Sequence, residues 1–332
     1  MDYKRVLITG GAGFLGSHVV PLLLRSGREV VVLDDFSNGK EEHLAAVIHH
    51  PKLTILRGDI TVLRDVQHAC EGCDAIIHLA VLCLRQSIRD ALRVTDVIVR
   101  GTINCLDVSL QQKLKLFLNC SSSEVLGTAV RIPMDEDHPL NPETPYAAAK
   151  VAQDMLVASY GRTYGLPWTT IRPFNMYGPN SHWQGHRGEV IPKMVVRAMN
   201  RKPLIIFGDG SQSRDFLFVE EAAKAVVAVL ETPAAYGQSI NFCTGVDTSV
   251  RRIAELICKA FGFDPGDMIE YQEGRPGDVH RHIGDVSRFK KLLGFTPQVP
   301  LEDGVLRTVQ WFRKLPIAPD KMLAQMATRN WE

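Results

Sequence analysis

The sequence lacks a long apolar segment, a block of like charge and a dense set of cysteines. No apolar run approaches the roughly 20 residues that span a bilayer, and the N-terminus leads into a predicted strand instead of a signal peptide. Lys and Arg total 38 against 37 Asp and Glu, which excludes the strong positive field typical of nucleic-acid-binding proteins. We therefore expect a cytoplasmic protein that binds neither membranes nor nucleic acids.

The seven cysteines are odd in number and spread from Cys70 to Cys258, unlike those of small disulfide-stabilised proteins. Cys70 and Cys73 have the spacing of a redox dithiol or half a zinc site, but no second such pair accompanies them. The histidines lack cysteine or carboxylate partners at the spacing of metal ligands. We expect reduced cysteines and no bound metal.

Over the first 130 residues, short apolar runs alternate with longer segments of helical period, which indicates βαβ units around a parallel sheet. From about residue 174 the chain becomes richer in Pro, Gly and irregular segments. The sequence therefore predicts a doubly wound α/β fold with a smaller, interleaved lobe. The predicted strands span Arg5–Thr9, Glu29–Leu33, Leu53–Arg57, Ala75–Leu79, Lys115–Ser121, Trp168–Arg172 and Ser239–Phe242, and the predicted helices Leu15–Ser26, Val62–Ala69, Ala91–Gln112 and Tyr146–Tyr164.

A glycine-rich turn joins the first predicted strand to the first helix, with glycines at 10, 13 and 16. Glycine permits a tight turn and close backbone approach, so a pyrophosphate can bind the free N–H groups at the helix N-terminus. The second strand ends in Asp34 and Asp35, which places a carboxylate 18 residues after Gly16 for a ribose hydroxyl pair. Asp34 repels a 2′-phosphate, and no Lys or Arg directly follows it. We therefore predict NAD as the cofactor.

Asp59, Leu79 and Ala80 follow or end two further predicted strands, toward the same edge of the sheet. Asp59, after the third strand, is placed to accept a hydrogen bond from the adenine amino group, with an ordinary loop carboxylate as the alternative. Leu79 and Ala80, at the end of the fourth strand, are predicted to lie along the dinucleotide.

Tyr146 and Lys150 stand four residues apart, on one face of a predicted helix. A nearby fixed cation favours the phenolate, so the pKa of Tyr146 would fall and the phenol could exchange a proton near neutral pH. Alone, this spacing also fits the start of a surface helix after Pro145. After a dinucleotide fingerprint and a strand that ends in serines 121–123 and Glu124, it indicates catalysis, because parallel sheets bind ligands at the carboxyl ends of their strands.

The chain resembles the extended short-chain dehydrogenase/reductase family, specifically its nucleotide-sugar epimerases, dehydratases and decarboxylases. The resemblance covers nearly the whole chain and includes the glycine turn, Tyr146 and Lys150, together with residues 34–39, 172–179, 208–216 and 275–278. It implies a Rossmann-type NAD-binding domain over residues 1–173. Residues 174–332 would then form mainly the substrate-binding lobe, with a segment at about 215–245 that returns to the sheet.

In that family a tyrosine and a serine or threonine act on the sugar 4-hydroxyl, and a lysine binds the nicotinamide ribose. The resemblance gives these roles to Tyr146, Ser122 and Lys150, with Ser123 and Glu124 beside them. It implies that two arginines bind the substrate diphosphate, for which a bidentate guanidinium is chemically suited. The implied substrate-binding residues are Asn175, Arg214, Arg275, Asp278 and His282.

The fingerprint and the resemblance together give a predicted cofactor-binding set. Two departures from the family pattern accompany it, because Leu126 stands where a tyrosine is usual and Ile98 where an asparagine is usual. The predicted set is Gly10, Gly13, Phe14, Leu15, Gly16, Asp34, Asp35, Ser37, Asn38, Asp59, Ile60, Leu79, Ala80, Tyr146 and Lys150.

Oxidation at C4 of a sugar acidifies the C5 proton, so one hydride step can lead to epimerisation, 4,6-dehydration or decarboxylation of a uronic acid. Glu124 resembles the glutamate of the dehydratases and decarboxylases, whereas residues 275–279 and Asp285 look more like the 4-epimerases. Ser123 stands where dehydratases that protonate C6 carry an aspartic acid. We expect C4 epimerisation of a UDP-sugar, with dehydration, decarboxylation and a non-catalytic NAD-binding regulator as alternatives.

The long predicted helices Ala91–Gln112 and Tyr146–Tyr164 carry apolar positions that could pair across a two-fold axis. The family resemblance points the same way. We therefore expect a homodimer held by a four-helix bundle, with apolar stripes that all face the sheet as the alternative.

Overall fold

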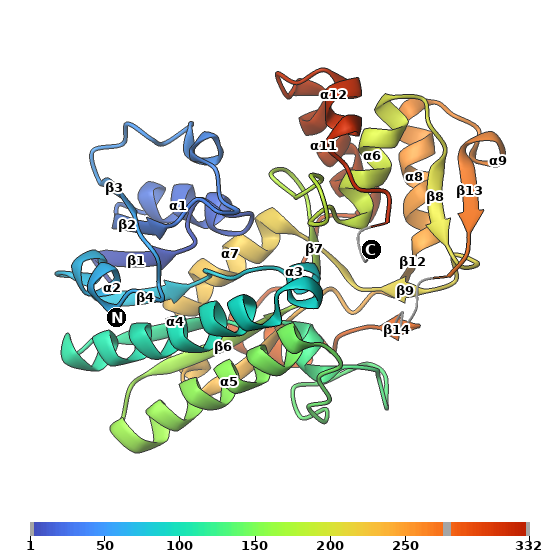
Figure 1. The fold of residues 1–332 in the computed structure, drawn as a ribbon. Helices are drawn as coiled ribbons and strands as arrows, with labels where there is room; N and C mark the ends of the chain where they lie inside the picture. The colour runs from blue at the N-terminus through green and yellow to red at the C-terminus, as the bar shows by residue number, and fades with distance from the viewer. Residues whose placement is uncertain (1–2, 275–279, 330–332) are drawn as a thin grey trace.

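The computed structural model describes residues 3–274 and 280–329. Its centre is a seven-stranded parallel sheet in the order β11-β6-β5-β4-β1-β2-β3, with helices on both faces (Figure 1). This is the predicted Rossmann-type doubly wound fold. The strands are β1 (Arg5–Thr9), β2 (Glu29–Asp34), β3 (Leu53–Arg57), β4 (Ala75–His78), β5 (Leu116–Cys120), β6 (Trp168–Pro173) and β11 (Gln238–Phe242).

The central strands are short, rich in Val, Ile and Leu, and mostly buried, as expected for a parallel sheet covered on both faces. Helices α1 (Gly16–Arg25) and α7 (Val219–Leu230) pack on one face in one hydrophobic cluster. Helices α2 (Leu63–Cys70), α4 (Ala91–Gln111) and α5 (Pro145–Tyr164) pack on the other. The bounds of α1, α2, α4 and α5 agree with the predicted ones to within one residue, whereas α7 was not among the predicted helices.

Local sequence explains where α5 begins and ends. The Thr144 hydroxyl accepts a hydrogen bond from the Ala147 N–H, Pro145 occupies the first turn, and Gly165 closes the helix in the left-handed conformation. These signals place Tyr146 at the first turn of α5, next to the carboxyl end of β5.

Elements that follow β6 in the chain build a second lobe with its own hydrophobic core. The chain returns from this lobe to the central sheet through α7 and β11. The lobe's strands are short, and the irregular composition after residue 174 did not predict them. They are β7 (Asn175–Tyr177) with β10 (Phe216–Phe218), β8 (Leu204–Phe207) with β13 (Ile269–Gln272), and β12 (Thr248–Ser249), β9 (Ser213–Arg214) and β14 (Arg281–His282) in one sheet.

Three longer helices of this lobe pack against one another, and the other helices not yet described are shorter. Within residues 3–274 and 280–329, no helix has the length and apolar character required to cross a membrane. The remaining helices are α6 (Val190–Met199), α8 (Val250–Phe261), α11 (Leu301–Lys314), α3 (Leu84–Arg89), α9 (Pro265–Met268), α10 (Ser287–Leu293), α12 (Pro319–Ala324), and the 3-10 turns η1 (Glu41–Leu44), η2 (Ser123–Leu126) and η3 (Pro233–Ala235).

Candidate active site

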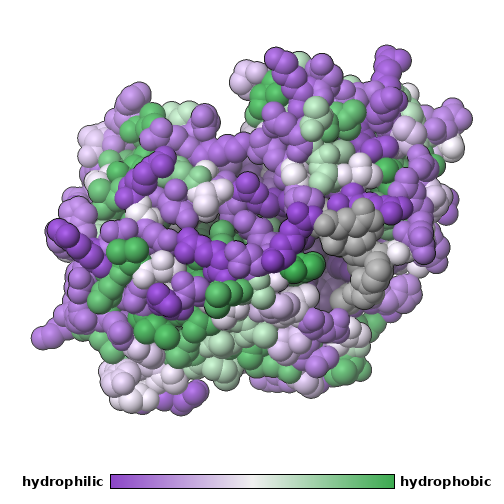
Figure 2. Space-filling view, viewed as in Figure 1, coloured by the Kyte–Doolittle hydropathy of each residue, from purple (hydrophilic) through white to green (hydrophobic). Residues whose placement is uncertain are grey.

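A cavity of about 610 Å³ lies between the carboxyl ends of the central strands and the second lobe. The surface is hollowed there, between the two halves of the molecule (Figure 2). Every residue of the predicted cofactor-binding set lines this cavity. Ser122, Glu124, Asn175 and Arg214, from the predicted catalytic and substrate-binding sets, line it as well.

The glycine turn between β1 and α1 leaves no room for side chains. Gly10 has a φ of +69°, and a Cβ atom on it would lie 2.7 Å from the Cα of Ala80. A Cβ atom on Gly16 would lie 2.5 Å from the carbonyl oxygen of Gly10. Bare backbone therefore faces the cavity at the start of α1, as the diphosphate of a dinucleotide requires.

Asp34, at the end of β2, fixes the neighbouring loops. One carboxylate oxygen accepts the Ala12 N–H at 2.9 Å, and the other accepts the Phe36 N–H at 2.9 Å. Burial raises the pKa of Asp34, and the two hydrogen bonds oppose that rise. Each oxygen keeps a lone pair for a ribose hydroxyl, so the glycine turn and Asp34 together fit NAD.

Asp59 is held by its own neighbours at the cavity wall. One of its oxygens accepts from the Thr61 N–H and hydroxyl at 2.8 Å each, and the other pairs with Arg93 at 3.0 Å. Burial acts to raise the pKa of Asp59, but these hydrogen bonds outweigh it and lower the pKa. Contact with the adenine amino group stays a prediction.

Tyr146 and Ser122 face each other across the cavity wall, from α5 and the end of β5. Burial raises the pKa of Tyr146 well above its ordinary value, and a hydrogen bond with Ser122 opposes the rise. The Lys150 ammonium lies 6.0 Å from the Tyr146 ring centroid, and its hydrogen bonds go to Cys120 and Gln153. The structure does not show the lowered pKa that the Tyr146–Lys150 spacing led us to expect, since burial outweighs the cation.

Lys150 begins a buried chain of hydrogen bonds. Its Nζ donates to the Cys120 carbonyl at 2.8 Å and to Gln153 Oε1 at 2.9 Å. Gln153 Nε2 donates to Thr102 Oγ1 at 2.9 Å, and the His78 ring bridges Thr102 at 3.0 Å and Thr9 at 2.8 Å. Burial lowers the pKa of His78 to about 3, so its ring is neutral. The chain fixes the direction of the Lys150 side chain below the cavity.

The turn η2 separates the two residues that follow Ser122. Glu124 lines the cavity, whereas Ser123 is buried and lies outside its wall. His282 also lies behind the wall, with its ring 5.0 Å from that of Phe174, and burial lowers its pKa to about 4. Neither Ser123 nor His282 belongs to the cavity wall, so their contact with a ligand stays a prediction.

The predicted substrate-binding residues are divided by the structure. Asn175 on β7 and Arg214 on β9 line the part of the cavity that the second lobe forms. Arg275 and Asp278 lie outside the described residues, so their roles stay predictions.

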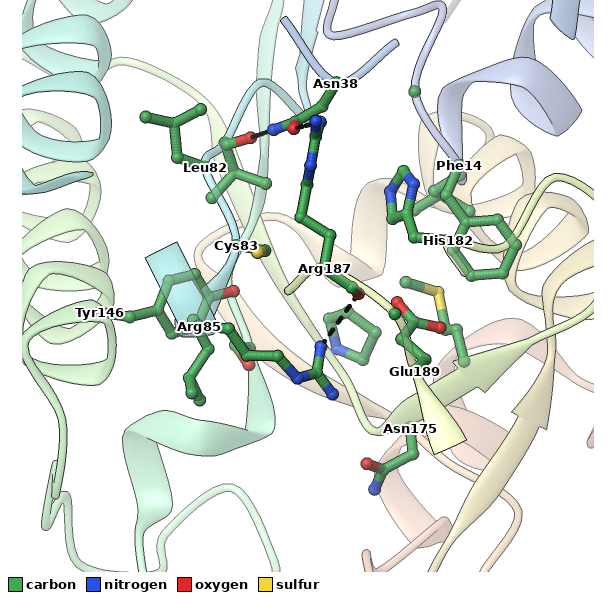
Figure 3. Close-up of a pocket in the computed structure, with 18 of the residues that line it drawn as sticks. Phe14, Asn38, Leu82, Cys83, Arg85, Tyr146, Asn175, His182, Arg187 and Glu189 are labelled. Carbon is green, nitrogen blue, oxygen red and sulfur yellow. Dashed lines mark hydrogen bonds between the residues drawn. The ribbon is translucent and has the colours of Figure 1, made fainter. Parts of the chain in front are cut away.

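The cavity also contains ionisable residues that sequence reasoning missed: Cys83, Arg85, His182, Arg187 and Glu189 (Figure 3). Burial raises the pKa of Glu189 to about 7, although Arg85 opposes the rise. The sequence signal that could have identified these residues is the group of charged residues directly before the helical pattern of residues 190–199. A carboxyl group with a pKa near neutrality can donate or accept a proton under ordinary conditions.

Comparison with known proteins agrees with this geometry. The family model described as "NAD dependent epimerase/dehydratase family" matches residues 6–243. The UDP-glucose 4-epimerase of Mycolicibacterium smegmatis is 36% identical over 312 residues, covering 93% of this chain and 98% of that protein.

Two solved structures are also similar over nearly the whole chain. UDP-glucose 4-epimerase from Thermotoga maritima, solved with UDP-glucose, has a TM-score of 0.87 at 30% identity, covering 93% of this chain and 99% of that one. dTDP-glucose 4,6-dehydratase from Streptomyces venezuelae, solved with NAD, has a TM-score of 0.87 at 31% identity, covering 93% and 97%. The fold, the cavity and these similarities together show that the chain belongs to the NAD-dependent epimerase/dehydratase family.

Proposed function

We propose that the protein is a nucleotide-sugar 4-epimerase that acts on a UDP-sugar through a 4-keto intermediate. The observation that carries this proposal is Ser123, which has no ionisable group and is buried away from the cavity. Elimination needs an acid for the C6 hydroxyl beside the base for C5, and serine cannot supply it at this position. Similarity to UDP-glucose 4-epimerases over nearly the whole chain supports the same reaction and the UDP-sugar.

The site residues can carry out the proton transfer that this reaction needs. Bound NAD supplies the hydride acceptor for C4. Tyr146 acts in its phenolate form: it would accept the proton of the sugar 4-hydroxyl, directly or through the Ser122 hydroxyl that hydrogen-bonds to it, and the phenol so formed would later return that proton. Lys150 is held beneath them by Cys120 and Gln153, where it is placed to bind the nicotinamide ribose.

A 4,6-dehydratase is the second candidate, and one observation favours it. Glu124 and Glu189 both line the cavity, and the pKa of Glu189 is raised to about 7. Such a pair offers a base and an acid, which elimination of water across C5 and C6 requires. Relatives of this activity resemble the chain to a similar extent.

The Glu124→Gln variant separates the two reactions. An epimerase never removes the C5 proton, so we expect the variant to keep measurable turnover of its UDP-sugar. A dehydratase uses the carboxylate as a base, and its loss would cost about 10²–10⁴-fold in rate. The exposed Glu71, which pairs with His68 far from the cavity, gives the matched control Glu71→Gln.

Product analysis in heavy water tests the same point on the wild-type protein. We expect a panel of UDP-, dTDP- and GDP-sugars to give a product of unchanged mass without deuterium at C5. Loss of water, loss of carbon dioxide or deuterium at C5 would each contradict epimerisation. Absence of turnover with every sugar in the panel, despite bound NAD, would favour the non-catalytic alternative.

We further propose a homodimer formed by α4 and α5. Leu92 on α4 is 82% exposed, and Met155 and Tyr164 on α5 are also exposed. Apolar residues interrupt the polar surface over these helices (Figure 2). An exposed apolar face on two adjacent helices suits a four-helix bundle with a second copy.

Sedimentation should give about twice 36.9 kDa, and Leu92→Glu with Met155→Glu should shift it to the monomer. A wild-type species of 36.9 kDa alone would contradict the dimer.

The proposed compartment is the cytoplasm. All seven cysteines carry free thiols, and five of them are buried. Such thiols are typical of a reducing compartment.

A further inference from the structure

Residues 182–187, between β7 and α6, cross from the second lobe to the cofactor-binding loops, and we call this segment the strap. The His182 ring meets the edge of Phe14 in the glycine turn, with ring centroids 6.3 Å apart. Lys40 lies 4.9 Å over the Trp183 ring and donates to Gln184 Oε1 at 2.9 Å. The strap therefore rests on both loops that would surround the dinucleotide.

Arg187 contacts the loop that follows Asp34, the residue at the end of β2 that is predicted to bind a ribose. Its Nη1 donates to the Ser37 carbonyl at 2.9 Å and to the side-chain oxygen of Asn38. The Asn38 amide donates to the Val81 carbonyl at 3.4 Å, and Arg85 Nη1 donates to the Arg187 carbonyl at 3.2 Å. These hydrogen bonds join the loop after β2, Arg187 and the segment from Val81 to Arg85 in one continuous series (Figure 3).

The cations of this region donate their hydrogen bonds to neutral groups, although Arg85 is close enough to Glu189 to oppose the rise of its pKa. Among the described residues, no carboxylate lies within ion-pair distance of Lys40, Arg85 or Arg187, whose hydrogen bonds end on carbonyl and amide oxygens. The pKa of His182 is lowered to about 4, first by burial and then by the charges of these cations. Two of them, Arg85 and Arg187, line the cavity. Guanidinium groups whose hydrogen bonds end on neutral oxygens are suited to bind a phosphate-bearing ligand.

The strap is also tied to the opposite side of the molecule. The Gly185 N–H donates to the Gln325 carbonyl at 2.7 Å, and Gln184 Nε2 donates to Gln325 Oε1 at 2.9 Å. The second lobe therefore holds the strap from behind, while Arg187 reaches forward over the cofactor loop. A ligand that binds Arg187 would connect the two lobes.

We propose that Arg187 and Arg85 bind the diphosphate bridge of NAD, and that the strap retains the cofactor between turnovers. Both NAD and a sugar nucleotide carry a diphosphate. The contacts of Arg187 with Ser37 and Asn38, and of His182 with Phe14, assign these cations to NAD. The inference rests on NAD as the cofactor and not on which sugar reaction follows.

Exchange of the retained cofactor tests this inference on the holoenzyme. Purified protein is mixed with an excess of isotopically labelled NAD, and the label in the protein is followed with time. We expect Arg187→Met to exchange about ten- to a hundredfold faster than the wild type, because a charge-assisted hydrogen bond to phosphate is lost. Arg187→Lys, which keeps the charge without the planar fork, should fall between them. Arg251→Met removes an exposed arginine that pairs with Glu255 outside the cavity, and should match the wild type.

Inhibition by UDP distinguishes the two sources of diphosphate. The inference requires that Arg187→Met leaves the inhibition constant of UDP within about twofold of the wild type. If that constant rises while NAD exchange is unchanged, the cations serve the substrate and the inference is wrong. Unchanged NAD exchange and unchanged UDP inhibition would overturn it too. If Arg187→Met does not fold, Arg85→Met provides the same comparison. NAD exchange needs no turnover, so its result stands whether or not the epimerase proposal holds.

Discussion

Tyr146→Phe is expected to lower turnover by roughly 10²–10⁴-fold while NAD stays bound. The substitution removes the only atom of the side chain that can exchange a proton and keeps the ring that packs at the cavity wall. Steady-state turnover measures the effect, and acid precipitation of the variant should release as much NAD as the wild type.

The control for this variant is Tyr271→Phe, because Tyr271 is an exposed residue on β13 outside the cavity. It should have wild-type turnover. A Tyr146→Phe protein that keeps bound NAD and more than a tenth of wild-type turnover would exclude the phenol as the proton-transfer group. Loss of NAD from that variant would show that the phenol hydroxyl itself helps to hold the cofactor.

Gly10→Ala is expected to abolish NAD binding and to lower the free energy of unfolding by several kcal/mol. A left-handed conformation costs a non-glycine residue about 1–2 kcal/mol. The new methyl group would also meet the backbone of Ala80, at 2.7 Å from its Cα and 2.8 Å from its nitrogen. Overpacking of this kind typically costs about 1–3 kcal/mol. Bound NAD and denaturant unfolding measure the two effects.

Gly27→Ala is the matched control for that substitution. Gly27 has a φ of +84°, but open space surrounds the position where its Cβ would lie. This variant should lose only the conformational part of the stability and should retain NAD. If the Gly10→Ala and Gly27→Ala variants have equal stability and equal NAD content, the close approach of the glycine turn to the end of β4 has no role in either property.

The central sheet could be predicted from the sequence because its strands are short apolar runs that local pattern alone identifies. Gly10, Gly16 and Asp34 could be predicted for the same reason, since all three belong to one β1–α1–β2 unit. Their structural requirements are local.

Other parts of the site could not be predicted because they depend on contacts between distant segments. Arg187 belongs to an irregular loop whose position follows from distant contacts, because Arg187 donates to Ser37, 150 residues away in sequence, and Gln184 of the same loop donates to Gln325, 141 residues away. The raised pKa of Tyr146 depends on burial, which the spacing to Lys150 does not report. Ser123 and His282 are buried outside the cavity wall, and burial depends on distant segments that the sequence pattern around these residues does not report.

The buried chain beneath Lys150 also fixes the tautomer of His78. The Thr102 hydroxyl donates to the Ile98 carbonyl, so its oxygen must accept from both Gln153 and the His78 Nε2–H. His78 Nδ1 then accepts from the Thr9 hydroxyl. Both nitrogens of the neutral His78 ring are therefore engaged, one as donor and one as acceptor, so the ring has no free nitrogen to take a proton from Lys150 through this chain. Any proton that Lys150 or Tyr146 exchanges with solvent must pass through the cavity.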